Sequence, residues 1–122
     1  MDKRESSSSL GRAGEAEAAV FLEMEGWNIL ARNFRTSQGE VDIVAARGDI
    51  LAFVEVKRWT RFGPSDLLDS INRAKTRRII ETSKLFLAKY RQYRGKHIRY
   101  DVLFLPSGGE PQRYEGAFDE TL

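Results

Sequence analysis

The chain has 122 residues, of which 41% are hydrophobic and 31% are charged, a balance typical of one globular domain rather than of a disordered chain. It holds no cysteine, which excludes disulfides, thiolate zinc sites and a cysteine nucleophile. No run of residues approaches the ~20 apolar positions of a membrane-spanning helix. The first residues also lack the apolar segment of a secretory signal, so we expect a cytoplasmic protein that does not enter a membrane.

The net charge of +2 conceals an uneven distribution along the chain. Between Lys57 and Arg99 there are thirteen Lys or Arg residues against three acidic ones, so this segment carries +10 and the remainder −8. A basic segment beside an acidic one is the pattern expected of a phosphate-binding surface around a carboxylate metal site. A solvated charged helix would give the same counts, and charge alone does not choose between the two.

The N-terminal residues predict a tail followed by a helix. The serine run at residues 6–9 is a low-complexity polar segment, so we expect residues 1–10 to form a flexible tail and residues 11–122 to form a single domain. The alanine-rich residues 14–25 predict the first helix, and Gly26 stands where a helix would end.

Three strands are expected next. Residues 27–35 predict the first, and residues 40–46 and 50–57, which are rich in β-branched and apolar residues, predict the second and third. Residues 47–49 read Arg-Gly-Asp, a turn signal, so the second and third strands should form a β-hairpin. The residues expected on one side of the first strand are Trp27, Ile29 and Ala31.

The C-terminal half predicts a long helix and two more strands. Ser65 or Asp66 can cap a helix that runs to about Tyr93. Residues 97–105 and 110–118 predict two further strands, the second at a sheet edge. This order of elements predicts an α/β sandwich in which helices pack on a mixed β-sheet. The residues expected on one apolar face of the long helix are Leu68, Ile79, Phe86 and Tyr90.

The register of the hairpin decides whether its charged residues meet. If Gly48 and Asp49 form a two-residue loop, the numbers of paired residues sum to 97 and Asp42 lies opposite Glu55. If the turn centres on Gly48, the sum is 96, and the two carboxylates lie on opposite faces of the sheet. In either register, Lys57 lies two residues on from Glu55 in the same strand and therefore on the same face.

These three charged residues suit a metal site. Adjacent carboxylates at Asp42 and Glu55 would repel one another and need a compensating partner. Mg²⁺ is such a partner, because it takes oxygen ligands and is commonly held by one or two carboxylates. Lys57 can then orient or deprotonate a water and stabilise transition-state charge. A cross-strand ion-pair network of the same residues is the structural alternative.

Five segments in chain order resemble the YraN-like family. They are Gly-Arg-Ala-Gly-Glu at 11–15, Gly-Glu-Val-Asp-Ile-Val at 39–44, Phe-Val-Glu-Val-Lys at 53–57, Arg-Phe-Gly at 61–63 and Lys-Thr-Arg-Arg at 75–78. That family is placed in the PD-(D/E)XK nuclease superfamily, near archaeal Holliday-junction resolvases. The resemblance implies a restriction-endonuclease-like three-layer core with a mixed β-sheet flanked by helices.

The resemblance also implies roles for particular residues. Asp42 matches the metal-binding aspartate of the superfamily, Glu55 the second acidic ligand, and Lys57 the catalytic lysine. The Val56 backbone carbonyl would then face the metal. Glu15 is similar to the first-helix glutamate that completes such sites in resolvases, and with the two ligands and the lysine it makes up the implied catalytic group.

Basic residues are the candidates for nucleic-acid binding. Lys75 resembles the lysine that follows the loop in the family, and its alternative is a lysine whose stem lies along the apolar face. Positively charged residues at helical spacing suit phosphate contact, or simply solvent. The other basic residues assigned to the nucleic acid are Arg61, Arg73, Arg77 and Arg78.

Other residues give weaker signals. His97 is the only histidine, and a structural role is favoured over a general base. Trp59 and Phe62 either stack on bases or pack against the sheet. Glu40 matches a family position to which we assign no role.

The sequence therefore predicts a divalent-metal-dependent endonuclease or phosphodiesterase that uses Mg²⁺ or Mn²⁺ and acts on nucleic acid, DNA in particular and branched DNA included. A non-catalytic nucleic-acid-binding module of the same fold and a structural or adaptor protein are the alternatives. A homodimer is implied by the likeness to resolvases alone.

Overall fold

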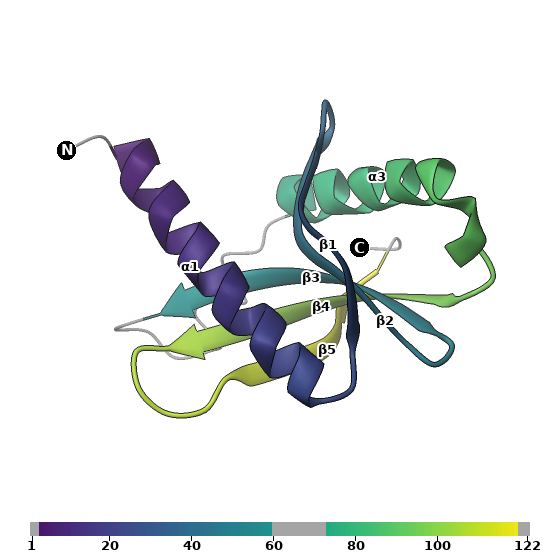
Figure 1. Cartoon of the computed structure of the whole chain (residues 1–122). Helices are drawn as coiled ribbons and strands as arrows, with labels where there is room; N and C mark the ends of the chain where they lie inside the picture. The colour runs from purple at the N-terminus through teal and green to yellow at the C-terminus, as the bar shows by residue number, and fades with distance from the viewer. Residues whose placement is uncertain (1–2, 60–72, 120–122) are drawn as a thin grey trace.

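Five strands, two α-helices and one 3₁₀ turn make up the part of the chain that the computed structural model describes, residues 3–59 and 73–119 (Figure 1). Strands occupy the middle and the end of the chain, and the helices precede and interrupt them. The elements are α1 (Lys3–Met24), β1 (Asn28–Thr36), β2 (Gly39–Arg47), β3 (Ile50–Trp59), α3 (Arg73–Lys89), η1 (Arg91–Tyr93), β4 (His97–Pro106) and β5 (Gln112–Phe118).

The strands form one mixed sheet in the order β1-β2-β3-β4-β5. β3 and β4 are parallel, and each other neighbouring pair is antiparallel. A parallel pair cannot be joined by a tight turn, and the chain between β3 and β4 includes α3. The predicted α/β fold with a mixed sheet flanked by helices is confirmed, and it is consistent with a restriction-endonuclease-like core.

α1 covers one face of the sheet. Ala18 and Leu22 of this helix are buried against Ile43 and Val54 of the two central strands. Small residues on α1 let the helix lie close to the sheet: a Cβ added at Gly14 would stand 3.7 Å from Leu105 Cδ1. This close approach fixes the height of the first helix above the sheet.

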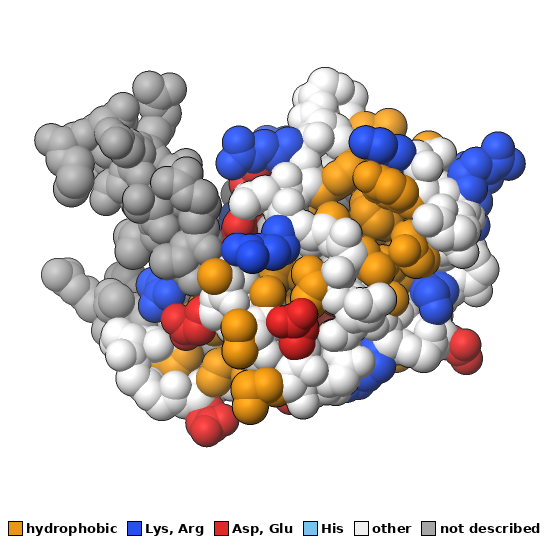
Figure 2. Space-filling view, viewed as in Figure 1, with side chains coloured by type: hydrophobic (Ala, Val, Ile, Leu, Met, Phe, Trp, Pro, Cys, Tyr) orange, Lys and Arg blue, Asp and Glu red, His pale blue; other side chains and the backbone are white. Residues whose placement is uncertain are grey.

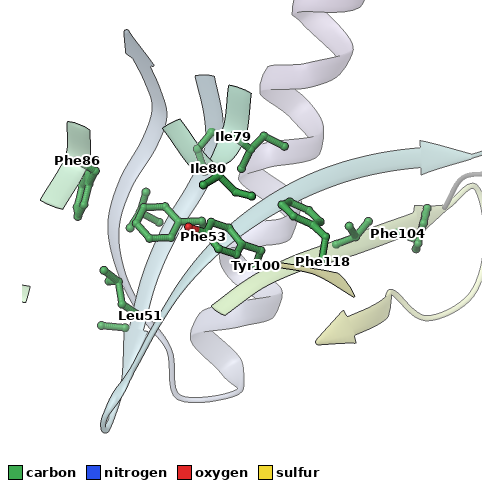
Figure 3. Packing of buried hydrophobic residues seen from close by; sticks show 12 residues of the cluster. Leu51, Phe53, Ile79, Ile80, Phe86, Tyr100, Phe104 and Phe118 are labelled. Atoms are coloured by element: carbon green, nitrogen blue, oxygen red, sulfur yellow. The ribbon is translucent and has the colours of Figure 1, made fainter. Parts of the chain in front are cut away.

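α3 covers the opposite face, where aromatic residues fill the core (Figure 3). The Phe53 ring packs edge-on against Phe86 with centroids 5.6 Å apart, and it stacks on Tyr100 at 5.8 Å. Burying a side chain of this size is worth ~1.5–3 kcal/mol relative to exposure. Ile79 and Phe86 of α3 and Tyr90, which directly follows the helix, all contact this core, as the sequence predicted.

The hairpin has the register that places Asp42 level with Glu55. Pairing runs from Arg47–Ile50 to Ile43–Val54, so paired numbers sum to 97. Gly48 has φ +57°, a left-handed conformation that glycine adopts at little cost, and it begins the two-residue loop. The first of the two predicted registers is therefore the one adopted.

Both helices differ from their predicted limits. α1 begins at Lys3 and not at residue 14, so that prediction was wrong. Once a helix is nucleated, extending it through a serine costs only a few tenths of a kcal/mol relative to alanine. α3 ends at Lys89, before the predicted Tyr93, because Tyr90 leaves the helical region (φ −115°, ψ 75°) and packs its ring 4.7 Å from Phe86. The predicted caps Ser65 and Asp66 and the apolar Leu68 lie outside the described residues.

One side-chain direction in β1 was also predicted wrongly. The pairing of β1 with β2 shifts between Ile29 and Ala31, which marks a bulge at Leu30. Ile29 stays with Trp27 in the core beneath α1, whereas Ala31 turns to the α3 side. The division into a tail at 1–10 and a domain at 11–122 stays a prediction.

Candidate active site

The candidate site lies where β2 separates from β3. The paired part of the two strands ends at Ile43–Val54, and beyond it the β1–β2 hairpin bends away from β3 (Figure 1). Asp42 stands at the first position past the last pair. Its Oδ2 accepts a 2.7 Å hydrogen bond from the backbone N–H of Val56. The carboxylate thereby satisfies a backbone donor at a position of β3 that has no partner on β2.

This hydrogen bond also indicates where the Val56 carbonyl points. In a β-strand the N–H and C=O of one residue point to the same edge, because a hydrogen-bonded pair exchanges both bonds. Since the Val56 N–H points to Asp42, its C=O lies on that same side. The Val56 carbonyl oxygen therefore borders the gap that Asp42 enters.

Glu55 and two lysines lie beside Asp42. The Glu55 side chain is 11% exposed, and its Oε1 lies 3.8 Å from the Nζ of Lys75 on α3. Burial, then the charge of Asp42, raises the pKa of Glu55 to about 8, although Lys75 and Lys57 act in the opposite direction. Burial, followed by the proximity of Lys75, lowers the pKa of Lys57. The hairpin and α3 thus bring two carboxylates and two lysines together.

Glu15 reaches the same cluster from α1. The residue is only 3% exposed, and its Oε1 accepts a hydrogen bond from Asn33 Nδ2. Burial, then the charge of Asp42 and a hydrogen bond with it, raises the pKa of Glu15 to about 7. An ion pair between Glu17 and Arg58, 3.1 Å long, ties this part of α1 to β3.

The donor set suits a hard cation. Among the described residues, no three His, Cys, Asp or Glu side chains form a ready-made metal-ligand group. Asp42 instead interacts pairwise with Glu15 and with Glu55, and both of these have a pKa raised well above 4.5. Oxygen donors that repel one another are stabilised by a divalent cation, and Mg²⁺ commonly uses only one or two protein carboxylates. The residues therefore fit Mg²⁺ or Mn²⁺.

The basic residues of α3 differ in their relation to this cluster. Lys75 is half-buried and belongs to the cluster itself, whereas Arg73, Arg77 and Arg78 are exposed. Figure 2 shows Lys and Arg side chains beside Asp and Glu side chains, below and to the left of the tip of the β1–β2 hairpin. Arg61 lies outside the described residues.

The weaker candidates lie elsewhere or have other partners. His97 begins β4 and pairs with Ile50, at the end of β3 that is distant from Lys57. Its backbone N–H donates to the Asp49 carbonyl at 2.7 Å. This position favours the structural role predicted for it. Glu40 forms a 2.6 Å ion pair with Arg35, an exposed pair at the paired positions of β1 and β2. The Trp59 side chain and Phe62 lie outside the described part.

Sequence reasoning missed Asn33 altogether. Nothing about an asparagine in a predicted strand marks it as functional, but the hairpin register offers a signal. Because its neighbours in β1 pair with Ile43 and Val41, Asn33 lies directly opposite Asp42. The sequence also placed Lys75 only on the nucleic-acid surface, whereas the structure brings it to Glu55.

The fold and this cluster define a restriction-endonuclease-like α/β domain with a carboxylate–lysine group where two strands part. Residues 14–105 match the family described as "Uncharacterised protein family UPF0102". The chain belongs to this family, and the resemblance to the YraN-like family is thereby confirmed.

Relatives in that family match most of the chain. The UPF0102 protein of Azorhizobium caulinodans is 38% identical over 117 residues, which cover 96% of this chain and 88% of that protein. The UPF0102 protein of Treponema pallidum (strain Nichols) is 43% identical over 98 residues, covering 80% and 78%. That of Rhodopseudomonas palustris is 35% identical over 111 residues, covering 91% and 84%. These relatives establish membership of the family.

The length and polarity of the helices bear on membranes. In residues 3–59 and 73–119, no helix is both long and apolar enough to cross a lipid bilayer.

Proposed function

We propose that the protein is a divalent-metal-dependent phosphodiesterase that cleaves nucleic acid, DNA in particular and branched DNA included. One observation carries the proposal: at the gap between β2 and β3, Asp42 lies beside Glu55, whose side chain is only 11% exposed and also contacts Lys75. Lys57 follows on the same strand face. Carboxylates for a cation and lysines for a phosphate are thereby within reach of one bound phosphodiester.

Each residue has a distinct task in this proposal. Asp42, Glu55 and the Val56 carbonyl would hold Mg²⁺ or Mn²⁺. When bound, the cation supplies a Lewis acid for the phosphoryl oxygen and lowers the pKa of a bound water. Lys57 orients or deprotonates the attacking water and stabilises the negative charge that develops on the phosphoryl oxygens. Lys75, which lies beside Glu55, neutralises charge on the phosphate.

The electrostatics argue against a purely structural ion-pair network. In such a network, the opposite charges around each carboxylate favour its ionised form and lower its pKa. Here burial and the charge of Asp42 raise the pKa of both Glu15 and Glu55, and for Glu55 they do so despite the nearby Lys75 and Lys57. A cluster that costs folding free energy is typical of a functional site, where a ligand offsets the cost.

The experiment that tests the proposal measures metal binding and cleavage together. Calorimetric titration should detect one or more Mn²⁺ ions bound at millimolar concentration or below. Linear, flapped and four-way DNA and matching RNA are then incubated with Mg²⁺, Mn²⁺ or EDTA. Metal-dependent cleavage supports the proposal. A protein that binds nucleic acid without binding Mn²⁺ or cleaving any substrate would be the non-catalytic module instead.

Reversing charge on α3 should weaken nucleic-acid binding. Arg73 and Arg77 are exposed and four residues apart on one helix face, at the end of α3 that holds Lys75. We expect Arg73→Glu with Arg77→Glu to lower duplex affinity by about tenfold or more and to reduce the slope of log affinity against log salt by about 2. Fluorescence anisotropy at several salt concentrations measures both quantities.

The matched control for that experiment reverses two exposed basic residues at the far end of the helix. Lys89 and Arg91 lie there, and Lys89→Glu with Arg91→Glu should change affinity by less than about threefold. Thermal unfolding confirms that both double variants fold. If the two double variants weaken binding equally, the effect reflects net charge and the binding surface is not the one we propose.

Two further expectations rest on the sequence alone. The homodimer implied by the likeness to resolvases and the cytoplasmic location stay predictions. Sedimentation equilibrium of the purified full chain distinguishes a 13.9 kDa monomer from a dimer of twice that mass.

A further inference from the structure

Asn33 has a backbone conformation that few residue types tolerate. Of the described residues other than glycine, it alone has a positive φ, +55°. In this left-handed region an L side chain is disfavoured by ~1–2 kcal/mol, and asparagine is the type that tolerates it best after glycine. Such backbone outliers concentrate at functional sites, where surrounding structure holds them in place.

The outlier lies where the neighbouring strand is also irregular. Asn33 stands opposite Asp42 in the β1–β2 pairing. Val41 and Ile43, on either side of Asp42, belong to cores on opposite faces of the sheet, although residues two apart in a regular strand share a face. The two strands therefore deviate at the same level, which is the level of the candidate metal ligand.

The side chain of Asn33 is directed at Glu15. Its Nδ2 donates to Glu15 Oε1, and this hydrogen bond stabilises the charged form of the carboxylate against burial and the repulsion of Asp42. A purely conformational need at φ +55° is met by glycine without any side chain. The amide therefore adds what glycine would lack: a neutral donor that places a buried carboxylate next to Asp42 without adding charge.

We propose that Asn33 is a positioning residue, whose left-handed backbone and side-chain amide hold the Glu15 carboxylate beside Asp42 for cation binding. The inference rests on the proposed function, since it assigns the cation to the Asp42 site. Asn33 itself touches neither substrate nor cation; it acts through Glu15. Partners of metal-ligating groups typically change metal affinity ~10–100-fold when removed.

The test is a double-mutant cycle in the full chain. Asn33→Gly keeps the backbone conformation and removes the donor, and Glu15→Gln removes the acceptor charge. We expect Asn33→Gly to raise the Mn²⁺ concentration for half-maximal binding about tenfold. In the Glu15→Gln background the same change should have no further effect, because the amide then has no carboxylate to place. Asn28→Gly, at an exposed asparagine of the same strand, is the matched control and should leave Mn²⁺ binding unchanged.

The outcomes separate this inference from the proposed function. A half-saturating Mn²⁺ concentration that shifts while the cleavage rate at saturating Mn²⁺ stays within about threefold supports positioning. A lower melting temperature with unchanged Mn²⁺ binding would mean a structural role and overturn the inference alone. Equal effects of Asn33→Gly with and without Glu15→Gln would show that Asn33 does not act through Glu15. A wild-type protein that binds no Mn²⁺ would overturn both.

Discussion

Asp42→Asn is expected to abolish Mg²⁺- and Mn²⁺-dependent cleavage while leaving affinity for DNA in EDTA intact or improved. The carboxylate lies between Glu15 and Glu55 and so is the shared member of the cluster. A metal ion supplies several kcal/mol of transition-state stabilisation, and each 1.36 kcal/mol corresponds to a tenfold change in rate. We therefore expect the cleavage rate to fall by at least about a hundredfold. DNA affinity is kept because a negative charge beside the phosphates is removed.

Asparagine is the suitable replacement because it preserves the local structure. Its amide oxygen can accept the hydrogen bond from the Val56 N–H that Asp42 accepts in the wild type. The variant should therefore fold, and in EDTA its melting temperature should equal or exceed that of the wild type, since the repulsion with Glu15 and Glu55 is relieved. Single-turnover cleavage, anisotropy and calorimetry on the same sample measure the three quantities.

Lys57→Ala provides the contrasting variant. Its proposed task concerns the attacking water and transition-state charge, so Mn²⁺ affinity should be largely retained while turnover falls by about a hundredfold or more. A structural ion-pair network gives another pattern, in which both variants lower the melting temperature and Mn²⁺ affects neither. That pattern would leave the protein without a metal-dependent role at this cluster.

Local chemistry made the hairpin predictable from the sequence. Gly48 and Asp49 separate two runs of β-branched and apolar residues, and a two-residue loop with glycine first fixes the register of its strands. That register places Asp42 level with Glu55. The strand predicted at 97–105 is β4 (His97–Pro106), which ends at Pro106, because a proline has no N–H with which to continue a central strand.

Long-range packing determines the features that the sequence did not reveal. Lys75 reaches Glu55 because α3 crosses one face of the sheet, and no spacing along the chain encodes that 3.8 Å approach. The left-handed backbone of Asn33 and the bulge near Leu30 are likewise imposed by neighbours. Resemblance alone suggested Glu15, since helical periodicity did not separate it from Glu17.

The metal-free protein is expected to lose stability as the pH rises from about 5 to about 8, and Mn²⁺ is expected to restore it. The pKa of Glu15 is about 7 and that of Glu55 about 8 in the folded protein, against 4.5 for an ordinary glutamate. The folded state therefore binds protons more tightly than the unfolded chain. The stability that these protons contribute is fully present below about pH 4.5 and is lost as the pH rises through 7 and 8.

A divalent cation replaces those protons, so its stabilising effect should grow with pH. Calorimetric melting at pH 5.5 and pH 8, in EDTA and in Mn²⁺, should give a gain in melting temperature that is larger at pH 8 by about 5 °C or more. Asp42→Asn isolates the cluster from all other titrating groups. It removes a carboxylate whose charge raises both pKa values, so its metal-free stability should vary less with pH than that of the wild type. If the two proteins show the same pH dependence in EDTA, or if the Mn²⁺ gain is equal at both pH values, the buried carboxylates are not the groups that bind the cation.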